Sequence, residues 1–442
     1  MASRDHFATR LGFVLAAAGS AVGLGNIWKF PFMTGQNGGG AFLVLYIVFV
    51  LTIGFSVMLA EFAIGRAGQR NPVGSFRTLK GGAWPAVGGL GVVAGFVILS
   101  FYSVVGGWTL AYALKSVSGA LASNDPQVLG AAFGAFISDP LDVIGFHAAF
   151  MVLTLVIVAG GVRGGIERAA RILMPVLALL VIVLAVRAVT LDGAAKGIAF
   201  FLTPDFSKVT WSTVNAALGQ AFFSLSLGMG TMITYASYLN RQVNLANTAA
   251  QVTVLDTGFA VVAGFMILPA VFAFGFDPAA GPGLTFITLP AVFAQMPAGA
   301  LFAFLFFVLL AIAALTSAVS IIEPVVSYLI DERGLSRRAA TWGAGAVIWA
   351  LGVPSALSLG PWKDLTVGGK GILDAVDYLA SNIMLPLGGI LIVLFVGWSV
   401  AARAVDEVQS GGAHPFALAR VWIFICRFVA PAAVAWVMIQ GL

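Results

Sequence analysis

The stretch that decides the fold is LGFVLAAAGSAVGLGNIWKFP, residues 11–31. It begins and ends as an apolar helix, but residues 19–26 contain three glycines and the polar Ser20 and Asn26. In hydrocarbon an unpaired backbone N–H or C=O costs several kcal/mol, so a membrane helix breaks only where protein or water supplies partners. The break therefore predicts a mid-membrane binding site, with free carbonyls for a cation and a half-helix N-terminus for an anion. Alternatively, Gly19 and Gly23 only let another helix approach closely.

The composition is that of a membrane protein. Of the 442 residues, 60% are hydrophobic and 9% are charged, and the mean hydropathy is +1.01. So few charges cannot cover a water-soluble domain, so lipid must surround most of the chain. The net charge of +5 is scattered among short loops and predicts no nucleic-acid partner. A single cysteine, Cys426, excludes a disulfide scaffold, and the polar N-terminus shows no signal-peptide cleavage site.

Eleven apolar runs come near or exceed the roughly 20 residues that a membrane helix needs. They lie at about 11–33, 41–64, 86–115, 143–161, 171–189, 214–239, 247–275, 298–330, 339–357, 373–401 and 417–440. No long polar insertion separates them, so residues 1–442 are predicted to form one transmembrane domain. Fifteen basic residues fall on the N-terminal side of the membrane and seven on the other. This asymmetry predicts a cytoplasmic N-terminus, and the odd number of spans then places the C-terminus outside. We expect a multi-pass protein of the plasma (inner) membrane.

The sixth run repeats the interruption of the first. Residues 220–230, QAFFSLSLGMG, place two serines and two glycines inside an apolar helix. Two broken spans five helices apart indicate an inverted repeat. Residues 11–189 would form the first repeat and 214–401 the second, with 1–10 as a cytoplasmic segment and 417–440 as an eleventh helix. The predicted fold is an all-α membrane protein of about eleven transmembrane helices, a 5+5 inverted repeat with helices 1 and 6 unwound and one added C-terminal helix.

These motifs resemble those of the neurotransmitter:sodium symporter family, especially its bacterial amino-acid transporters, for which inverted repeats with broken helices are already known. The resemblance runs from Arg4 through NGGGAF (37–42), FFSLSLGMGTMITYASY (222–238) and LTSAVSIIEP (315–324) to the tenth span. It covers nearly the whole chain. It implies a sodium-coupled symporter that works by alternating access, and not an enzyme.

The resemblance also implies two Na⁺ sites, each a cage of hard oxygens. The first would combine the Ala21 carbonyl, Asn26, Ser224 and Asp256 with the carboxylate of the substrate. The second would use the carbonyls of Gly19, Val22 and Ala313 and the hydroxyls of Thr316 and Ser317. Alternatively, these two hydroxyls bond back to their own helix.

Asp256 stands where many relatives have Asn, and a carboxylate inside a membrane span is a functional candidate by default. The chloride-site positions of the animal relatives correspond to Tyr46, Gln220, Ser224, Asp256 and Ala260. Ala260 has neither the serine hydroxyl of chloride-dependent members nor the glutamate of some bacterial ones. We therefore expect Asp256 to supply the fixed negative charge, making transport chloride-independent. It could also take up a proton when the empty carrier returns; the alternative is a merely structural Asp.

The resemblance places the substrate between the two breaks. Its carboxylate would meet the N–H groups near Leu24 and Gly25 and the Tyr102 hydroxyl, and its ammonium group the carbonyls of the sixth span. The full predicted set is Ser20, Ala21, Leu24, Gly25, Ile98, Tyr102, Phe223, Ser224, Ser226, Met229, Ser317 and Ile321. These side chains are mostly apolar and none is charged, which favours neutral, hydrophobic or aromatic L-amino acids.

Two gates also follow from the resemblance. Lys29 and Asp377 would form the outer charged pair above a lid of Tyr102 and Phe223. Because lysine lacks the arginine fork of many relatives, this pair should be loose or water-mediated. On the cytoplasmic side Arg4 would pair with Asp331, close to Ser237 and Tyr238. Glu61 and Glu323 receive no definite role.

Other classes of function compete with a sodium symporter. A channel would need a continuous polar lining, and a non-transporting receptor would not need both sodium sites. An intramembrane enzyme is not expected because His6, His147 and His414 are isolated and are predicted to lie near the membrane surfaces. A proton-driven carrier using Asp256, or a symporter for another zwitterion or an amine, remains an alternative. The oligomeric state is left open.

Overall fold

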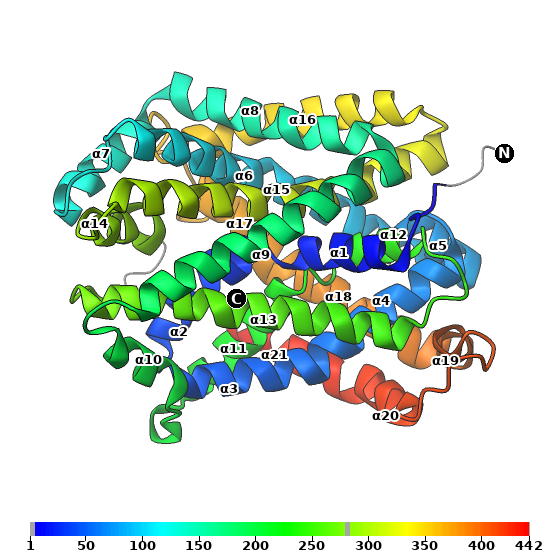
Figure 1. The fold of residues 1–442 in the computed structure, drawn as a ribbon. Coiled ribbons are helices and arrows are strands. Elements are labelled where there is room, and N and C mark those ends of the chain that lie inside the picture. Colours follow the sequence, from blue (N-terminus) through cyan, green and yellow to red (C-terminus); the bar gives the residue numbers. More distant parts are fainter. Residues whose placement is uncertain (1–4, 279–282, 442) are drawn as a thin grey trace.

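The computed structural model describes residues 5–278 and 283–441 and shows a bundle of long helices (Figure 1). Within these residues nine helices are long and apolar enough to cross a membrane, and the bent first pair makes a tenth. The sixth predicted span consists of two shorter helices, so the count of eleven stays a prediction. The all-α architecture with two interrupted spans is confirmed.

The first five spans contain these elements: α1 (Arg10–Ala21), η1 (Gly25–Lys29) and α2 (Phe30–Gln36); α3 (Gly40–Phe49), η2 (Val50–Gly54) and α4 (Phe55–Gly68); α6 (Pro85–Val117); α8 (Pro140–Ala159); η3 (Val162–Glu167) and α9 (Arg168–Val189). Most bounds lie within a few residues of the predicted runs. The fifth span begins earlier than expected, because the π-turn η3 adds a polar first segment to the apolar helix.

The second five are α11 (Trp211–Ser224) and α12 (Thr231–Ala236); α13 (Leu245–Ala273); α15 (Gly299–Arg333); α16 (Arg337–Leu357); α17 (Ile372–Tyr378), η6 (Leu379–Met384), α18 (Leu385–Leu394) and η7 (Phe395–Ser399). The last span consists of α20 (Ala419–Phe424), η8 (Ile425–Val429) and α21 (Ala430–Gly441). The longest helices, α6 and α15, pack along each other, and α1 of the first span lies against α15, α13 and α9.

Short elements fill the loops: α5 (Pro72–Leu79), α7 (Pro126–Ser138), α10 (Ala194–Leu202), η4 (Phe206–Lys208), η5 (Leu284–Thr288), α14 (Leu289–Ala294) and α19 (Ala401–Gln409). A two-stranded antiparallel hairpin of β1 (Thr366–Val367) and β2 (Lys370–Gly371) pairs Thr366 with Gly371. Figure 1 shows the start of α1, α5, α12 and α19 at one end of the bundle and α7, α10 and α14 at the opposite end. We call these the N-terminal end and the far end.

Candidate functional site

The first span is interrupted where the glycine-rich segment predicts it. The backbone bends by 50° between Arg10–Ala21 and Gly25–Gln36. The N–H of Val22 still donates to the Ala18 carbonyl, but that of Gly23 donates to Asn26 Oδ1 at 3.2 Å. Asn26 N then donates to the Gly23 carbonyl at 3.2 Å. The Asn26 side chain thus closes a tight turn that replaces one turn of helix.

The sixth span is interrupted between Ser224 and Thr231. Ser226, Gly228 and Gly230 have φ values of 54°, 84° and 73°, in the left-handed region that ends a right-handed helix. The freed Gly228 N–H donates to Glu61 Oε1 at 2.7 Å, and the same carboxylate faces the N–H groups of Met232 and Ile233. Glu61, for which no definite role was predicted, therefore supplies the acceptor that the broken helix lacks.

The two breaks are joined through one carbonyl. Ser20 O, at the end of α1, accepts hydrogen bonds from Ser226 Oγ at 2.9 Å and Ser317 Oγ at 3.1 Å. The first hydroxyl belongs to the sixth-span break and the second to α15. Ser317 thus bonds across to the first span and not back to its own helix, as one alternative held.

A polar ring surrounds Asp256 on α13, which is 0% exposed. Asn26 Nδ2 donates to Asp256 Oδ1 at 2.7 Å and lies 3.0 Å from Ser224 Oγ. Ser224 Oγ donates to Asp256 Oδ2 at 2.9 Å, and the Tyr46 hydroxyl lies 3.5 Å from that oxygen. Nearby, Gln220 Nε2 donates to the Gly25 carbonyl at 2.8 Å. The four side chains around the buried Asp256 carboxylate are neutral: Asn26, Ser224, Tyr46 and Gln220. None of them is a fixed cation that would balance the carboxylate charge.

This ring contains three of the four residues predicted for the first Na⁺ site. Asn26, Ser224 and Asp256 offer amide, hydroxyl and carboxylate oxygens, the hard donors that Na⁺ prefers. Ala21, the fourth predicted residue, lines the central cavity described below. The arrangement fits a cation that replaces the direct hydrogen bonds among these groups.

The second predicted site lies between α1, α9 and α15. Gly19 and Thr316 line a cavity of about 10 Å³ there, which holds about one water-sized atom. Thr316 Oγ1 donates to the carbonyls of Ala313 at 3.0 Å and Ile312 at 3.2 Å, as the helix-bonding alternative expects. Its lone pairs remain available to a cation. Val22 and Ala313 do not line this small cavity.

The predicted substrate residues surround one central cavity of about 40 Å³. All of them line it except Ser224, whose hydroxyl faces Asp256. The Tyr102 hydroxyl lies beside Ser317 Oγ and Leu24 N–H, yet it forms no well-shaped hydrogen bond with the part of the chain described. Ser20 Oγ is likewise buried without a partner there. These two polar groups share the wall with Ser226, Ser317 and Ser381, and the remaining side chains of the wall are apolar.

Four lining residues were not predicted: Gly23, Phe101, Ser381 and Leu385. Phe101 neighbours the predicted Tyr102, and Gly23 belongs to the predicted break. The only sequence signal for the other two is a serine within the apolar tenth span. Their position follows from the packing of η6 and α18 against the sixth-span break.

Phe223 separates the central cavity from an outer cavity of about 170 Å³ at the far end. Lys29 Nζ lies 4.1 Å from the centroid of the Phe223 ring, a cation–π distance. Asp377 attracts Lys29 electrostatically, but the two form no ion pair within 4.0 Å in the described structure. Asp377 instead accepts from Ser381 Oγ at 2.8 Å. The Phe223 lid is therefore held by its contact with Lys29, and the Asp377 carboxylate acts on the lysine from a longer distance.

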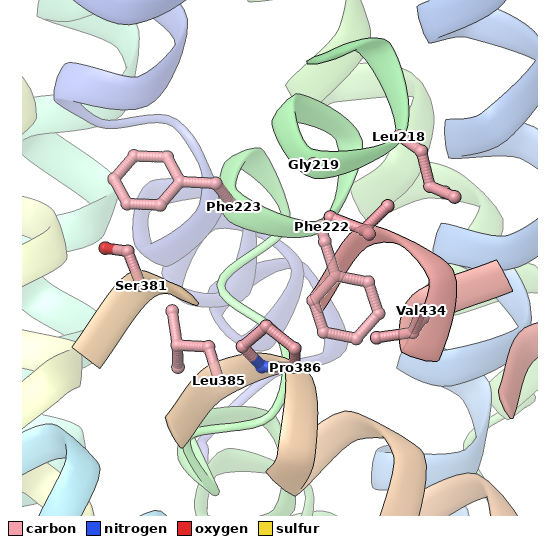
Figure 2. A pocket seen from close by; sticks show the side chains of 9 residues that line it. Leu218, Gly219, Phe222, Phe223, Ser381, Leu385, Pro386 and Val434 are labelled. Carbon is pink, nitrogen blue, oxygen red and sulfur yellow. The ribbon is translucent and has the colours of Figure 1, made fainter. Parts of the chain in front are cut away.

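A second apolar pocket of about 40 Å³ lies behind this lid. Figure 2 shows Phe222 and Phe223 leaving α11 in different directions, with Phe223 on the side of Ser381 and Phe222 beside Val434. Phe223, Ser381 and Leu385 line both this pocket and the central cavity. A movement of the Phe223 ring would thus change both spaces.

At the N-terminal end a buried ion pair closes the bundle. Glu323, 0% exposed, accepts from Arg337 Nη2 at 2.7 Å through both oxygens and from the Tyr238 hydroxyl at 2.6 Å. Asp331 accepts from the backbone and side chain of Asn71 at 2.7 and 3.3 Å. Arg4, its predicted partner, lies outside the described residues. The hydrogen bonds of Glu323 were not predicted, because its partner Arg337 belongs to the next helix and comes close only in the folded chain.

His147, which is predicted to lie near a membrane surface, is buried among helices. Its ring is 0% exposed, and Nε2 lies 2.8 Å from Ser103 Oγ of α6. Gly352 of α16 leaves room for the ring, because a Cβ there would lie 2.5 Å from His147 Cε1. Close packing of three helices, which sequence position does not reveal, therefore covers this side chain.

The fold and site together define a class: membrane carriers in which two interrupted helices surround a central cavity closed at both ends. More specifically, the chain belongs to the Sodium:neurotransmitter symporter family, whose sequence model matches residues 4–128 and 144–442. It is therefore a membrane transporter of a sodium symporter family and not an enzyme.

Bacterial relatives match over nearly their whole length. The chain is 40% identical to the uncharacterised sodium-dependent transporter YhdH of Bacillus subtilis, over 98% of this chain and 97% of the relative. It is 37% identical to an uncharacterised sodium-dependent transporter of Haemophilus influenzae, over 99% and 98%. The crystal structure of MhsT in complex with L-phenylalanine superimposes with a TM-score of 0.91, at 45% identity and full coverage of both chains.

Proposed function

We propose that this protein imports neutral, hydrophobic or aromatic L-amino acids together with two Na⁺ ions. The observation that carries the proposal is the meeting of both helix breaks at one cavity directly beside the Asp256 ring. The cavity wall combines apolar side chains with the hydroxyls of Ser20 and Tyr102, which have no hydrogen-bond partner among the residues described. The similarity to MhsT, crystallised with L-phenylalanine, supports the same substrate class.

In this proposal each end of the zwitterion has its own partner. The carboxylate binds at the first break, near the N–H groups of Leu24 and Gly25 and the Tyr102 hydroxyl, where a helix begins. The ammonium group binds carbonyls at the sixth-span break around Phe223 and Ser226. The side chain then lies against Ile98, Met229 and Ile321, which form an apolar surface without charges.

The two ions bind at the sites described. Na⁺ at the first site is held by Ala21, Asn26, Ser224 and Asp256 and touches the substrate carboxylate, so the amino acid completes the coordination shell. Na⁺ at the second site joins the first span to α15 through Gly19, Val22, Ala313, Thr316 and Ser317. Transport of Na⁺ and of the amino acid is coupled, because each ion joins mobile helix segments that the substrate also joins.

Asp256 makes transport chloride-independent in this proposal, because a carboxylate already stands beside the first ion. When Na⁺ leaves, the same carboxylate loses its nearest cation, and uptake of a proton compensates its charge during the return step. Alternating access uses Phe223 and Lys29 at the far end and Glu323, Arg337, Asp331 and Arg4 at the N-terminal end. We place the N-terminal end in the cytoplasm, on the basis of its basic loops.

The test is uptake by purified protein in liposomes, with each of the twenty amino acids and with Na⁺, choline or a pH gradient as the driving condition. We expect concentration of hydrophobic and aromatic amino acids that needs external Na⁺ and persists when gluconate replaces chloride. Uptake driven by a pH gradient in choline would instead support the proton-driven alternative, which the uncompensated Asp256 also allows. Selective uptake of an amine or osmolyte would overturn the substrate class.

A further inference from the structure

Arg427 is a cation inside the last span that the transport site does not use. It lies in η8, eight residues after the start of α20, or about 12 Å along a helix axis. The described residues place no carboxylate within 4.0 Å of its guanidinium group. A charged side chain in a membrane span normally pairs with a counter-charge or reaches the interface. Among the described residues Arg427 has no such counter-charge, which leaves its guanidinium available to an anion from outside the chain.

The guanidinium is nevertheless held in a fixed place. Arg427 Nε donates to the Gly397 carbonyl of η7 at 2.6 Å, and the group stacks 5.4 Å from the Trp398 ring. Trp398 Nε1 donates back to the Arg427 carbonyl at 3.3 Å. Gly397 permits this approach, because a Cβ there would lie 2.8 Å from Arg427 Cγ. The Nη groups, with four of the five N–H donors, keep no acceptor among the residues that the structure describes.

The surroundings of Arg427 are apolar and face outward. Trp398, Phe424 and Phe428 are 60%, 56% and 49% exposed, and their rings contact one another in sequence, beginning with the Trp398 ring under the guanidinium. Arg420, seven residues earlier and almost two turns away, stands on the same helix face near the start of the span. Exposed tryptophan beside arginine is typical of the membrane–water boundary.

From this geometry we infer that Arg427 and Trp398 form a binding site for the phosphate of an anionic phospholipid, whose acyl chains lie over Phe424 and Phe428. The preorganised guanidinium fork fits two phosphate oxygens. A free phosphate ion would meet the same fork but could not use the exposed aromatic band. The site joins the tenth and eleventh spans, so bound lipid should stabilise their packing.

The inference is tested on detergent-purified protein by thermal unfolding and by native mass spectrometry. The probes are dioleoylphosphatidylglycerol, dioleoylphosphatidylcholine and inorganic phosphate. With the anionic lipid at about a hundredfold excess over its dissociation constant, the wild-type unfolding midpoint should rise by about 3 °C. The zwitterionic lipid should give less than half of that rise and inorganic phosphate none.

Arg427→Gln should lose at least half of the anionic-lipid shift and one retained lipid adduct. Arg163→Gln, which removes an exposed arginine at the same end of the bundle, should behave as wild type. If Arg427→Gln does not fold, Arg427→Lys keeps the charge without the fork and should show a reduced shift and fewer adducts. Unchanged shift and adduct number in the folded Arg427 variant, or a full shift with inorganic phosphate, would overturn the inference.

Discussion

Replacing Asp256 by Asn gives the sharpest test of the ion chemistry. The carboxylate is fully buried and is bonded only to the neutral groups of Asn26, Ser224 and Tyr46. Asparagine keeps nearly the same shape, so the ring can form again after the Ser224 hydroxyl rotates. What the substitution removes is the negative charge beside the first Na⁺ site.

The size of the effect follows from Coulomb's law. A cation coordinated by Asn26, Ser224 and Asp256 would lie at most about 5 Å from the centre of the Asp256 carboxylate, so the attraction calculated for that distance is a lower bound. At an effective dielectric constant of about 20, two unit charges at that distance attract by about 3 kcal/mol. Since about 1.4 kcal/mol corresponds to a tenfold change, Asp256→Asn should weaken Na⁺ binding about a hundredfold.

The assay is amino-acid uptake into proteoliposomes at increasing Na⁺ concentration, in chloride and in gluconate. The variant should need about a hundredfold more Na⁺ for half-maximal uptake in gluconate. Chloride should partly restore its affinity by replacing the missing charge, whereas wild type should be indifferent to chloride. Asp142→Asn, an exposed carboxylate at the start of α8, is the matched control and should leave both curves unchanged. A shift smaller than about threefold in the folded variant would refute the Coulomb argument.

Three further predictions concern the rest of the site. Thr316→Ala should raise the Na⁺ requirement equally in chloride and gluconate, while Thr316→Ser should keep most of the wild-type affinity in the same titration. Met229→Ala should enlarge the apolar wall and raise the ratio of tryptophan to leucine uptake by about tenfold, measured in competition; an unchanged ratio would contradict contact with the substrate. Glu323→Gln leaves Arg337 buried and unpaired and should destabilise the protein by about 3–5 kcal/mol, lowering the thermal midpoint. Its control, Glu332→Gln, breaks a pair with a half-exposed arginine and should cost at most about 1 kcal/mol.

The breaks could be predicted because their signals are local. Glycines and polar side chains inside an apolar run lower helix stability wherever the run folds, and the unwound segments after Ala21 and Ser224 lie within the predicted ranges. The resemblance also placed eleven of the twelve predicted substrate residues on one cavity. Their binding roles stay predictions.

Residues whose position depends on packing could not be predicted. Ser381 and Leu385 enter the cavity because the tenth span packs against the sixth-span break at Gly388, where an added Cβ would clash with the Gly228 carbonyl oxygen. The sequence contains this glycine but does not show which helix it meets. The loop helices such as α5 and α14 are too short to give a membrane-span signal. For Lys29, the loose pairing with Asp377 could be expected from lysine chemistry. Its contact with Phe223 could not, because that contact depends on the geometry of the lid.

The buried carboxylates explain why Asp256, among the acidic groups of the described chain, is the one suited to exchange a cation. Glu323 is paired with Arg337, and Glu167 with Arg171 at 2.5 Å, so a fixed guanidinium already balances each of them. Glu61 faces backbone N–H groups at the sixth-span break, where partial positive charge is also fixed. Asp256 alone of these four has only neutral side-chain partners, so its charge is best compensated by a mobile ion. Sodium and proton should therefore compete at this residue, and raising the internal proton concentration should speed the return step in wild type but not in Asp256→Asn.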